Sequence, residues 1–261
     1  MTKSLSIIAR NASEAAYPHL WQGLAGAWVP SLGVTGETLR DVSGRKHHGT
    51  LTNMDPATDW QASGGWSLEF AGTDTAGGNA SQNRVALPRD YGVDILTFSA
   101  WVRPKTLSKR GICTSAPVYN LPRFAITLLT TGQLEVYRGS NTTSTATLTT
   151  ARWQHISVAS DGVTTTFYLD GEFSNSASQS ISQPLQTQFM LGNNYWGAFD
   201  GYMDDVLIHN RVITSRENKL LATRRGIAFH RKRRRVYSIP AGPAFKAVWA
   251  TRATTIAGVL Q

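Results

Sequence analysis

The stretch WQHISVASDGVTTTFYLDGEFSNS (153–176) constrains the fold of this chain more than any other. It holds two Asp-Gly pairs, Asp161-Gly162 and Asp170-Gly171, each between segments in which apolar and polar residues alternate. An Asp-Gly pair in this setting is a strong signal for a tight β-hairpin, because both residues accept the positive φ angles that such turns require. The stretch therefore predicts three consecutive antiparallel strands.

The same alternation recurs along most of the chain. In LTFSAWVRP (96–104), one face carries Phe98, Ala100 and Val102, the other carries Thr97, Ser99 and Trp101, and Pro104 closes the strand. Two more strands flank the Thr-Thr-Gly-Gln turn at 130–133, and 189–194 and 201–213 supply two others. No long stretch with a 3.6-residue period precedes residue 213, so we expect an all-β fold.

The pattern changes after residue 213. Thr214 and Glu217 have the spacing of a helix capping box, and we expect a short helix that ends at Gly226. Residues 1–18 and 227–261 lack strong periodicity, so we interpret them as N- and C-terminal arms around a domain at 19–226. We expect residues 20–226 to fold without the arms.

The positive charge of the chain is concentrated in its C-terminal arm. The chain has 26 Lys and Arg against 17 Asp and Glu, a formal net charge of +9. Seven of those basic residues and no acidic residue lie in 227–261, so the first 226 residues carry a net charge of only +2. A neutral body offers no continuous basic surface, and we expect no specific nucleic-acid site.

Cys113 is the single cysteine, which excludes an intrachain disulfide and a cysteine metal cluster. We expect its thiol to be buried. The N-terminal apolar run LSIIA is shorter than a secretory core, and no window approaches the roughly 18 apolar residues of a membrane span. We therefore expect a protein that is made and kept in a cytoplasm and does not bind a membrane.

Five motifs in order carry a family resemblance. They are RDVSGRKHHGTL (40–51), SLEFAGTD (67–74), LTFSAWVRP (96–104), WQHISVASDGVTTTFYLDGE (153–172) and FDGYMDDVLIHNRVIT (199–214). Together they resemble the concanavalin A-like, laminin G-like domains over about residues 20–225. The resemblance implies an antiparallel jelly-roll β-sandwich, here with extended N- and C-terminal arms and one short helix.

The two flanking segments resemble the arms of jelly-roll proteins encoded among tailed-bacteriophage structural genes. This second resemblance implies a non-enzymatic virion protein, most simply a capsid decoration or cement protein that reaches the virion after assembly in the host cytoplasm. Its partners would be the major capsid protein or other virion subunits, with self-association in a lattice. The alternatives are a carbohydrate-binding adhesin of a phage tail or fibre, or a cellular lectin-like module.

Glucanases with this fold carry an E-x-D-x-x-E strand that places two carboxylates on one face, and no such spacing occurs here. Glu69, Glu135 and Glu172 stand alone on separate predicted strands. Asp204 and Asp205 are adjacent, so we expect them to point to opposite faces. A Gly-x-Ser-x-Gly nucleophile elbow is also missing, and we expect no enzyme activity.

The family resemblance implies one structural calcium ion, with Asp41 and Asp204 as ligands and Asp205 as the alternative to Asp204. Calcium takes six to eight oxygen ligands from carboxylates and carbonyls. The competing interpretation is that Asp41 makes an Asx turn before Gly44, and that Asp204 pairs with a nearby arginine.

The loop NNYWGAFDG supplies the candidate glycan-binding aromatics, Tyr195 and Trp196, because aromatic rings hold the apolar faces of sugars. We expect most of the other tryptophans to lie in the core.

The basic run at 231–235 allows three interpretations: a nucleic-acid grip, a solvated tail or an assembly arm. The apolar residues that follow favour an arm that binds a neighbouring subunit while its arginines pair with acidic groups. The residues expected in this contact are Arg231, Lys232, Arg233, Arg234, Arg235, Tyr237, Phe245 and Trp249.

Overall fold

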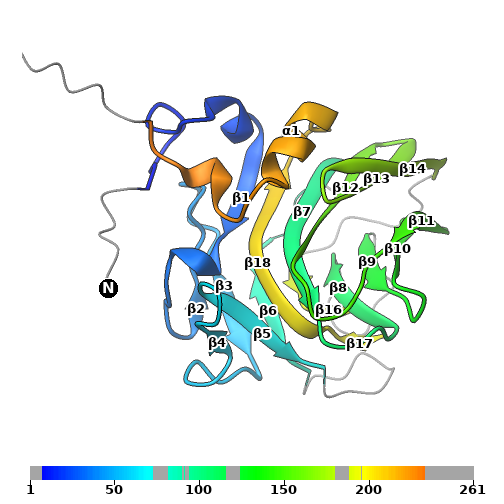
Figure 1. The fold of residues 1–261 in the computed structure, drawn as a ribbon, viewed down its shortest axis with the longest axis horizontal. Coiled ribbons are helices and arrows are strands. Elements are labelled where there is room, and N and C mark those ends of the chain that lie inside the picture. The colour runs from blue at the N-terminus through cyan, green and yellow to red at the C-terminus, as the bar shows by residue number, and fades with distance from the viewer. Residues whose placement is uncertain are drawn as a thin grey trace, which may run out of the picture.

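The computed structural model describes residues 8–72, 82–89, 91, 94–115, 124–179, 188–194 and 196–232, which form a sandwich of two sheets (Figure 1). Within these residues, one sheet has eight strands. In spatial order they are β14 (Glu172–Ser178), β13 (Thr164–Leu169), β12 (Gln154–Asp161), β7 (Ile95–Pro104), β18 (Asp200–His209), β5 (Ser67–Ala71) and β4 (Trp60–Gln61), with β1 (Leu24–Trp28) also paired to β18.

The other sheet has ten strands within the described residues. Its spatial order is β11 (Asn141–Thr147), β10 (Gln133–Tyr137), β9 (Ala125–Leu128), β8 (Arg110–Thr114), β15 (Phe189–Leu191), β6 (Arg84–Leu87), β3 (Gly49–Thr52) and β2 (Thr38–Leu39). The short strands β16 (Asn193–Asn194) and β17 (Gly197–Ala198) join it beside β8. The expected all-β sandwich is confirmed.

The three-stranded prediction for 153–176 is also confirmed, since β12, β13 and β14 pair in sequence. At the second hairpin, Asp170 and Gly171 have φ angles of 51° and 82°, which is the positive pair that favours Asp-Gly. At the first, the Asp161 carboxylate accepts hydrogen bonds from the backbone N–H groups of Val163 and Thr164.

The main core lies between the sheets and is rich in leucine and phenylalanine. Phe98, Ala100 and Val102 of β7 all point into it, as their alternation predicts. Phe189 stacks on Phe98 and Phe124, with ring centroids 6.4 and 6.3 Å away. Cys113 is fully buried in the same cluster.

A second apolar cluster covers the part of the outer face of the eight-stranded sheet that β1 and Leu207 of β18 form. Because side chains alternate along a strand, Val206 and Ile208 of β18 enter the main core, whereas Leu207 enters the second cluster. Short helices close this cluster, namely η2 (Pro18–Trp21), α1 (Ser215–Leu221) and η4 (Ile227–Phe229). A further one, η3 (Pro30–Leu32), follows β1. In Figure 1, α1 lies at one end of the long strands β7 and β18.

The described parts of both expected arms belong to this packed unit. Ile8 and Ala15 form antiparallel bridges with His230 and Arg231, respectively. The Trp21 indole donates a hydrogen bond to the carbonyl of Ala228, 2.8 Å away. The boundaries expected at residues 18 and 226 therefore pass through packed structure, because the two chain ends complete each other's backbone pairing.

The helix begins where the sequence predicts but ends earlier. The Thr214 side chain accepts from the Glu217 N–H, and the Glu217 carboxylate accepts from the Thr214 N–H, which is the predicted capping box. The α-helix ends at Leu221 rather than at Gly226. Gly226 instead adopts a left-handed φ of 73° as the residue before η4, and its N–H donates to the buried Asp205 carboxylate. No helix in the described part of the chain has the length and apolar character of a membrane span.

Candidate functional site

A bulge in β18 places Asp204 and Asp205 on the same side of the strand. The pairing of β18 with β7 shifts register between Asp204 and Leu207, and Asp205 has a left-handed φ of 50°. Asp204 accepts from the Ser31 N–H and Asp205 from the Gly226 N–H, and both carboxylates are buried. The expectation that they point to opposite faces was wrong, because the extra residue interrupts the alternation.

Burial raises the pKa of both carboxyl groups. The pKa of Asp204 rises to about 6, although hydrogen bonds from Ser31 and the charge of Arg225 oppose the rise. The pKa of Asp205 rises to about 7, since the Asp204 charge adds to the effect of burial.

The contacts of the two predicted calcium ligands match the competing interpretation. Asp41 accepts from the Ser43 N–H in an Asx turn and also from the backbone N–H groups of Ala27 and His47. Arg225 Nη1 lies 3.4 Å from Asp204 Oδ2. Within the described residues no group of three or more His, Cys, Asp or Glu side chains could hold a metal ion.

The Asp41 carboxylate already accepts backbone N–H groups, and the Asp204 carboxylate lies beside a guanidinium. These two residues therefore do not fit calcium, which needs six to eight oxygen ligands. The calcium ion therefore stays a prediction from the sequence.

An exposed indole lies on the outer face of the ten-stranded sheet. Trp196 is 39% exposed, and Lys109 Nζ lies 3.8 Å from its ring centroid. The same ammonium group lies 3.5 Å from Glu135 Oε1. We call Trp196, Lys109 and Glu135 the Trp196 platform. A cation at this distance is attracted to the face of the ring.

The sheet register explains how three distant segments meet there. Glu135 alternates with Leu134 and Val136, whose side chains enter the core, so Glu135 faces outward. It pairs with Thr127 of β9, which pairs with Gly111 of β8, which pairs with Ala198 of β17. The row between Glu135 and β17, which follows Trp196, thus consists of the small residues Thr127, Gly111 and Ala198, which are buried.

The sequence identified Trp196 but not its two charged neighbours. Tyr195 lies outside the described residues. Lys109 lies in the bend before β8 and Glu135 lies in β10, and only the predicted outward position of Glu135 could have indicated it. Of the other tryptophans, Trp28 and Trp60 are buried in the core, whereas Trp66 is 37% exposed.

The outward-facing glutamates are distributed over both sides of the sandwich. Glu69 lies on β5 of the eight-stranded sheet and bonds to Lys105, whereas Glu135 lies on β10 of the ten-stranded sheet. Glu172, on β14, is 3.0 Å from Lys219. The core separates Glu69 from Glu135, so those two cannot act on one glycosidic bond.

Most of the predicted assembly arm lies outside the described residues, including Arg233, Arg234, Arg235, Tyr237, Phe245 and Trp249. Of its described members, Arg231 Nε lies 3.9 Å from Glu14 Oε2, and the Lys232 N–H donates to the Glu14 carbonyl.

Solved structures similar to this chain share its fold at low identity. Domain 4 of AbnA, a GH43 extracellular arabinanase from Geobacillus stearothermophilus solved in complex with arabinotriose, is 20% identical with a TM-score of 0.59, over 76% of this chain and 98% of that one. Trypanosoma rangeli sialidase is 13% identical with a TM-score of 0.56, over 77% of this chain. The chain corresponds to only 32% of that sialidase.

The receptor-binding domain of botulinum neurotoxin type G is 10% identical with a TM-score of 0.56, over 77% of this chain and 51% of that one. No curated protein matches the chain. A laminin G family profile, described as the concanavalin A-like lectin/glucanases superfamily, matches residues 56–217, which is more than half of the chain. The chain therefore belongs to the concanavalin A-like lectin/glucanase superfamily, as a laminin G-like β-sandwich.

Proposed function

We propose that this protein is a non-enzymatic carbohydrate-binding protein and that the Trp196 platform holds the glycan. The observation that carries the proposal is an indole that stays exposed while a cation lies against its ring. A rigid ring binds the apolar face of a sugar at little entropic cost. Lys109 and Glu135 supply a donor and an acceptor for hydroxyl groups beside it.

The charges of the platform favour binding over hydrolysis. Glycosidases need two carboxyl groups about 5 to 9.5 Å apart across the scissile bond, one of them protonated. Glu135 is instead paired with Lys109, and Glu69 lies on the opposite sheet. The arabinotriose bound by the similar AbnA domain supports an oligosaccharide as the ligand class.

Calorimetric titration of the full chain with a panel of neutral oligosaccharides, arabinotriose included, tests the proposal. Trp196→Ala should weaken binding about tenfold or more, since a stacked aromatic contributes roughly 1 to 3 kcal/mol. Trp66→Ala is the matched control, because that indole is similarly exposed but lies in the loop before β5. Binding to no sugar on the panel, or an equal loss in both variants, would contradict the proposal.

A second candidate function is structural, as a subunit of a bacteriophage particle and most simply as a capsid decoration protein. It rests on the sequence alone: the flanking segments resemble phage arms, and seven basic residues without an acidic one fill 227–261. Arginine stems can cover apolar surface while their guanidinium groups reach acidic shell subunits. Glycan binding is compatible with this role, since a protein on the surface of a virion can also act as an adhesin.

Deletion of 233–261 tests the second candidate, because it leaves the described sandwich intact. We expect the shortened protein to fold but to fail to co-sediment with particles. Substitution of Arg233, Arg234 and Arg235 by Ser should weaken attachment most at low salt, and the difference from the natural chain should shrink at high salt, where ions screen the charges. Full occupancy of particles by the deletion variant would contradict this role.

A further inference from the structure

A row of four large side chains crosses the outer face of the eight-stranded sheet, on the side of the sandwich opposite the Trp196 platform. Arg103 of β7 pairs directly with Tyr202 of β18, and Tyr202 pairs with Glu69 of β5. On the other side of β7, Val102 pairs with Gln154, which places Trp153 beside Arg103. Glu69, Tyr202, Arg103 and Trp153 thus form one row, which we call the Arg103 row.

The aromatic rings of this row hold the arginine in place. The Arg103 guanidinium carbon lies 4.3 Å from the Tyr202 ring centroid and 5.9 Å from that of Trp153. The two rings are neighbours, with centroids 6.5 Å apart. Two further cations border the rings, since Lys105 Nζ is 5.1 Å from Tyr202 and the Arg225 guanidinium carbon is 4.4 Å from Trp153.

Arg103 differs from the neighbouring cations in having no carboxylate partner among the described residues. Lys105 bonds to Glu69, Arg225 lies 3.4 Å from Asp204, and Arg152 lies 3.2 Å from Asp170. The Arg103 side chain is only half-buried, and none of its nitrogens is a buried atom without a partner. The Tyr202 and Trp153 rings hold the plane of this guanidinium, which has no carboxylate partner among these residues.

We propose that the Arg103 row is a second binding site, whose ligand is an acidic saccharide. A guanidinium presents N–H groups in a fork that matches the two oxygens of a carboxylate or sulfate. The Tyr202 and Trp153 rings beside it offer apolar surface for the sugar ring that carries the anion. The Tyr202 hydroxyl adds a group that can bind a sugar hydroxyl.

The charge pattern favours a saccharide over a nucleic acid. A strand of nucleic acid requires several cations in line along its phosphates. In the Arg103 row one cation is free of a carboxylate, and the cations at both ends are neutralised by Glu69 and Asp204. A uronic acid or a sulfated sugar carries an anionic group beside a ring that can stack, and such a ligand matches the Arg103 row.

Titration calorimetry of the full chain tests this site with three saccharides of equal length: an oligogalacturonate, a sulfated oligosaccharide and a neutral galactan fragment. We expect the carboxylated or the sulfated sugar to bind. Comparison of these two titrations shows which anionic group the site takes. The neutral fragment should bind at least about tenfold more weakly, because it lacks the charge-assisted hydrogen bonds. A titration with hexathymidylate tests whether the site binds nucleic acid instead.

Arg103→Met should reduce affinity for the acidic saccharide about tenfold or more, since it removes the fork and keeps an aliphatic stem. Arg103→Lys should give a smaller loss of affinity, because lysine keeps the positive charge but lacks the forked N–H groups of the guanidinium. Arg152→Met is the matched control, because it removes the same charge from a nearby arginine whose partner is Asp170. Melting temperatures check that each variant is folded.

The inference would be overturned by equal losses in Arg103→Met and Arg152→Met, by tighter binding of the oligonucleotide, or by no binding of either acidic saccharide. The inference is independent of the proposed function, and Trp196→Ala separates the two. If that variant abolished acidic-saccharide binding while Arg103→Met did not, the Arg103 row would be excluded and the Trp196 platform would remain.

Discussion

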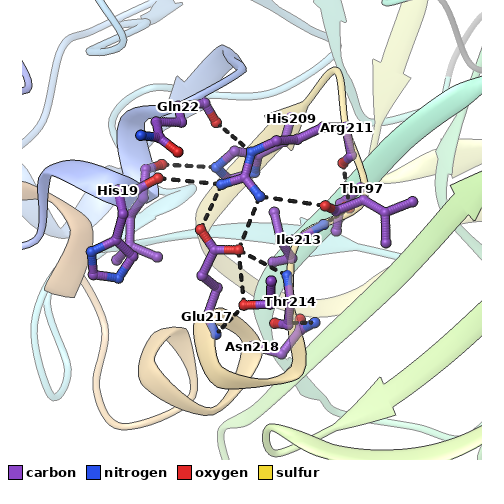
Figure 2. A network of polar contacts seen from close by, with 11 residues as sticks. His19, Gln22, Thr97, His209, Arg211, Ile213, Thr214, Glu217 and Asn218 are labelled. Carbon is purple, nitrogen blue, oxygen red and sulfur yellow. Dashed lines mark hydrogen bonds and ion pairs between the residues drawn. The ribbon is translucent and has the colours of Figure 1, made fainter.

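Arg211 and Glu217 face each other as a two-pronged ion pair, with Nη1 2.9 Å from Oε2 and Nη2 2.6 Å from Oε1 (Figure 2). The same guanidinium donates to the carbonyls of His19 and Gln22, and the same carboxylate closes the Thr214 capping box. One pair thus joins the residues before β1, the end of β18 and the start of α1. It connects segments nearly 200 residues apart.

Glu217→Gln should destabilise the chain by about 3 kcal/mol, because it breaks a mostly buried pair and leaves Arg211 without its counterion. Burial alone would raise the pKa of Glu217, but hydrogen bonds from Arg211 and Thr214 lower it to about 2. A lowered carboxyl pKa stabilises the fold above the unfolded pKa near 4.5, and this stability is lost as pH falls towards 2.

Urea unfolding of both proteins between pH 7 and pH 2 measures this effect. The difference in stability between the natural chain and Glu217→Gln should shrink across the window from about pH 4.5 to 2. A difference that stayed constant with pH would show that the pair contributes no ionic stability.

Asp205→Asn should stabilise the chain at pH 8. Burial and the Asp204 charge raise the pKa of Asp205 to about 7, so the stability that this group contributes is complete below pH 4 and is lost as pH rises through 7. Asparagine accepts the left-handed backbone and still accepts the Gly226 N–H, without a buried charge.

The control for this substitution is Asp205→Ala, which loses both the hydrogen bond and the tolerance for positive φ. We expect Asp205→Asn to melt higher than the natural chain at pH 8, and Asp205→Ala to melt lower. Identical melting temperatures for the two variants would contradict this account of the bulge.

The sandwich should need residues outside 20–226. Removal of 8–19 and 227–232 strips Ile8, Tyr17 and η4 from the second apolar cluster and leaves Trp21 without its partner carbonyl. A chain of residues 8–232 should therefore give a cooperative thermal transition, whereas 20–226 should melt at least about 10 °C lower or aggregate. Equal melting temperatures would restore the boundaries expected from the sequence.

Local patterns predicted the strands because the physics that selects them is local. The two Asp-Gly pairs fix hairpins between neighbours, and the alternation of Phe98, Ala100 and Val102 needs only one strand. The pairing of Ile8 with His230 joins the N-terminal and C-terminal segments, and no periodicity in either segment predicts it. The bulge at Asp205 likewise arises from contacts with Ser31 and Gly226, which lie far away in the sequence.

The binding surfaces were predictable only in part for the same reason. Trp196 stands out because an aromatic residue in a Gly- and Asn-rich loop has few structural uses. Lys109 and Glu135 approach it through the pairing of three strands, and Arg103 meets Tyr202 and Trp153 through the pairing of three others. Sheet order decides these meetings, and a single sequence does not encode it in short motifs.

Chelation tests the calcium prediction. An ion bound only by the folded state would raise the melting temperature, so EDTA would lower it. The amides that occupy Asp41 and the guanidinium beside Asp204 instead predict an unchanged melting temperature. A fall of several degrees that added calcium reverses would establish the ion.

The most direct test of the glycan-binding account is an NMR titration that follows the indole N–H signals, assigned by substitution of each tryptophan. The account predicts that a neutral oligosaccharide that binds the full chain shifts the Trp196 signal in a saturable way and leaves the Trp66 signal unchanged. It also predicts that the sugar remains intact at the end. A Trp196 signal that stays in place while the sugar binds elsewhere, or turnover of the sugar that Glu135→Gln abolishes, would contradict it.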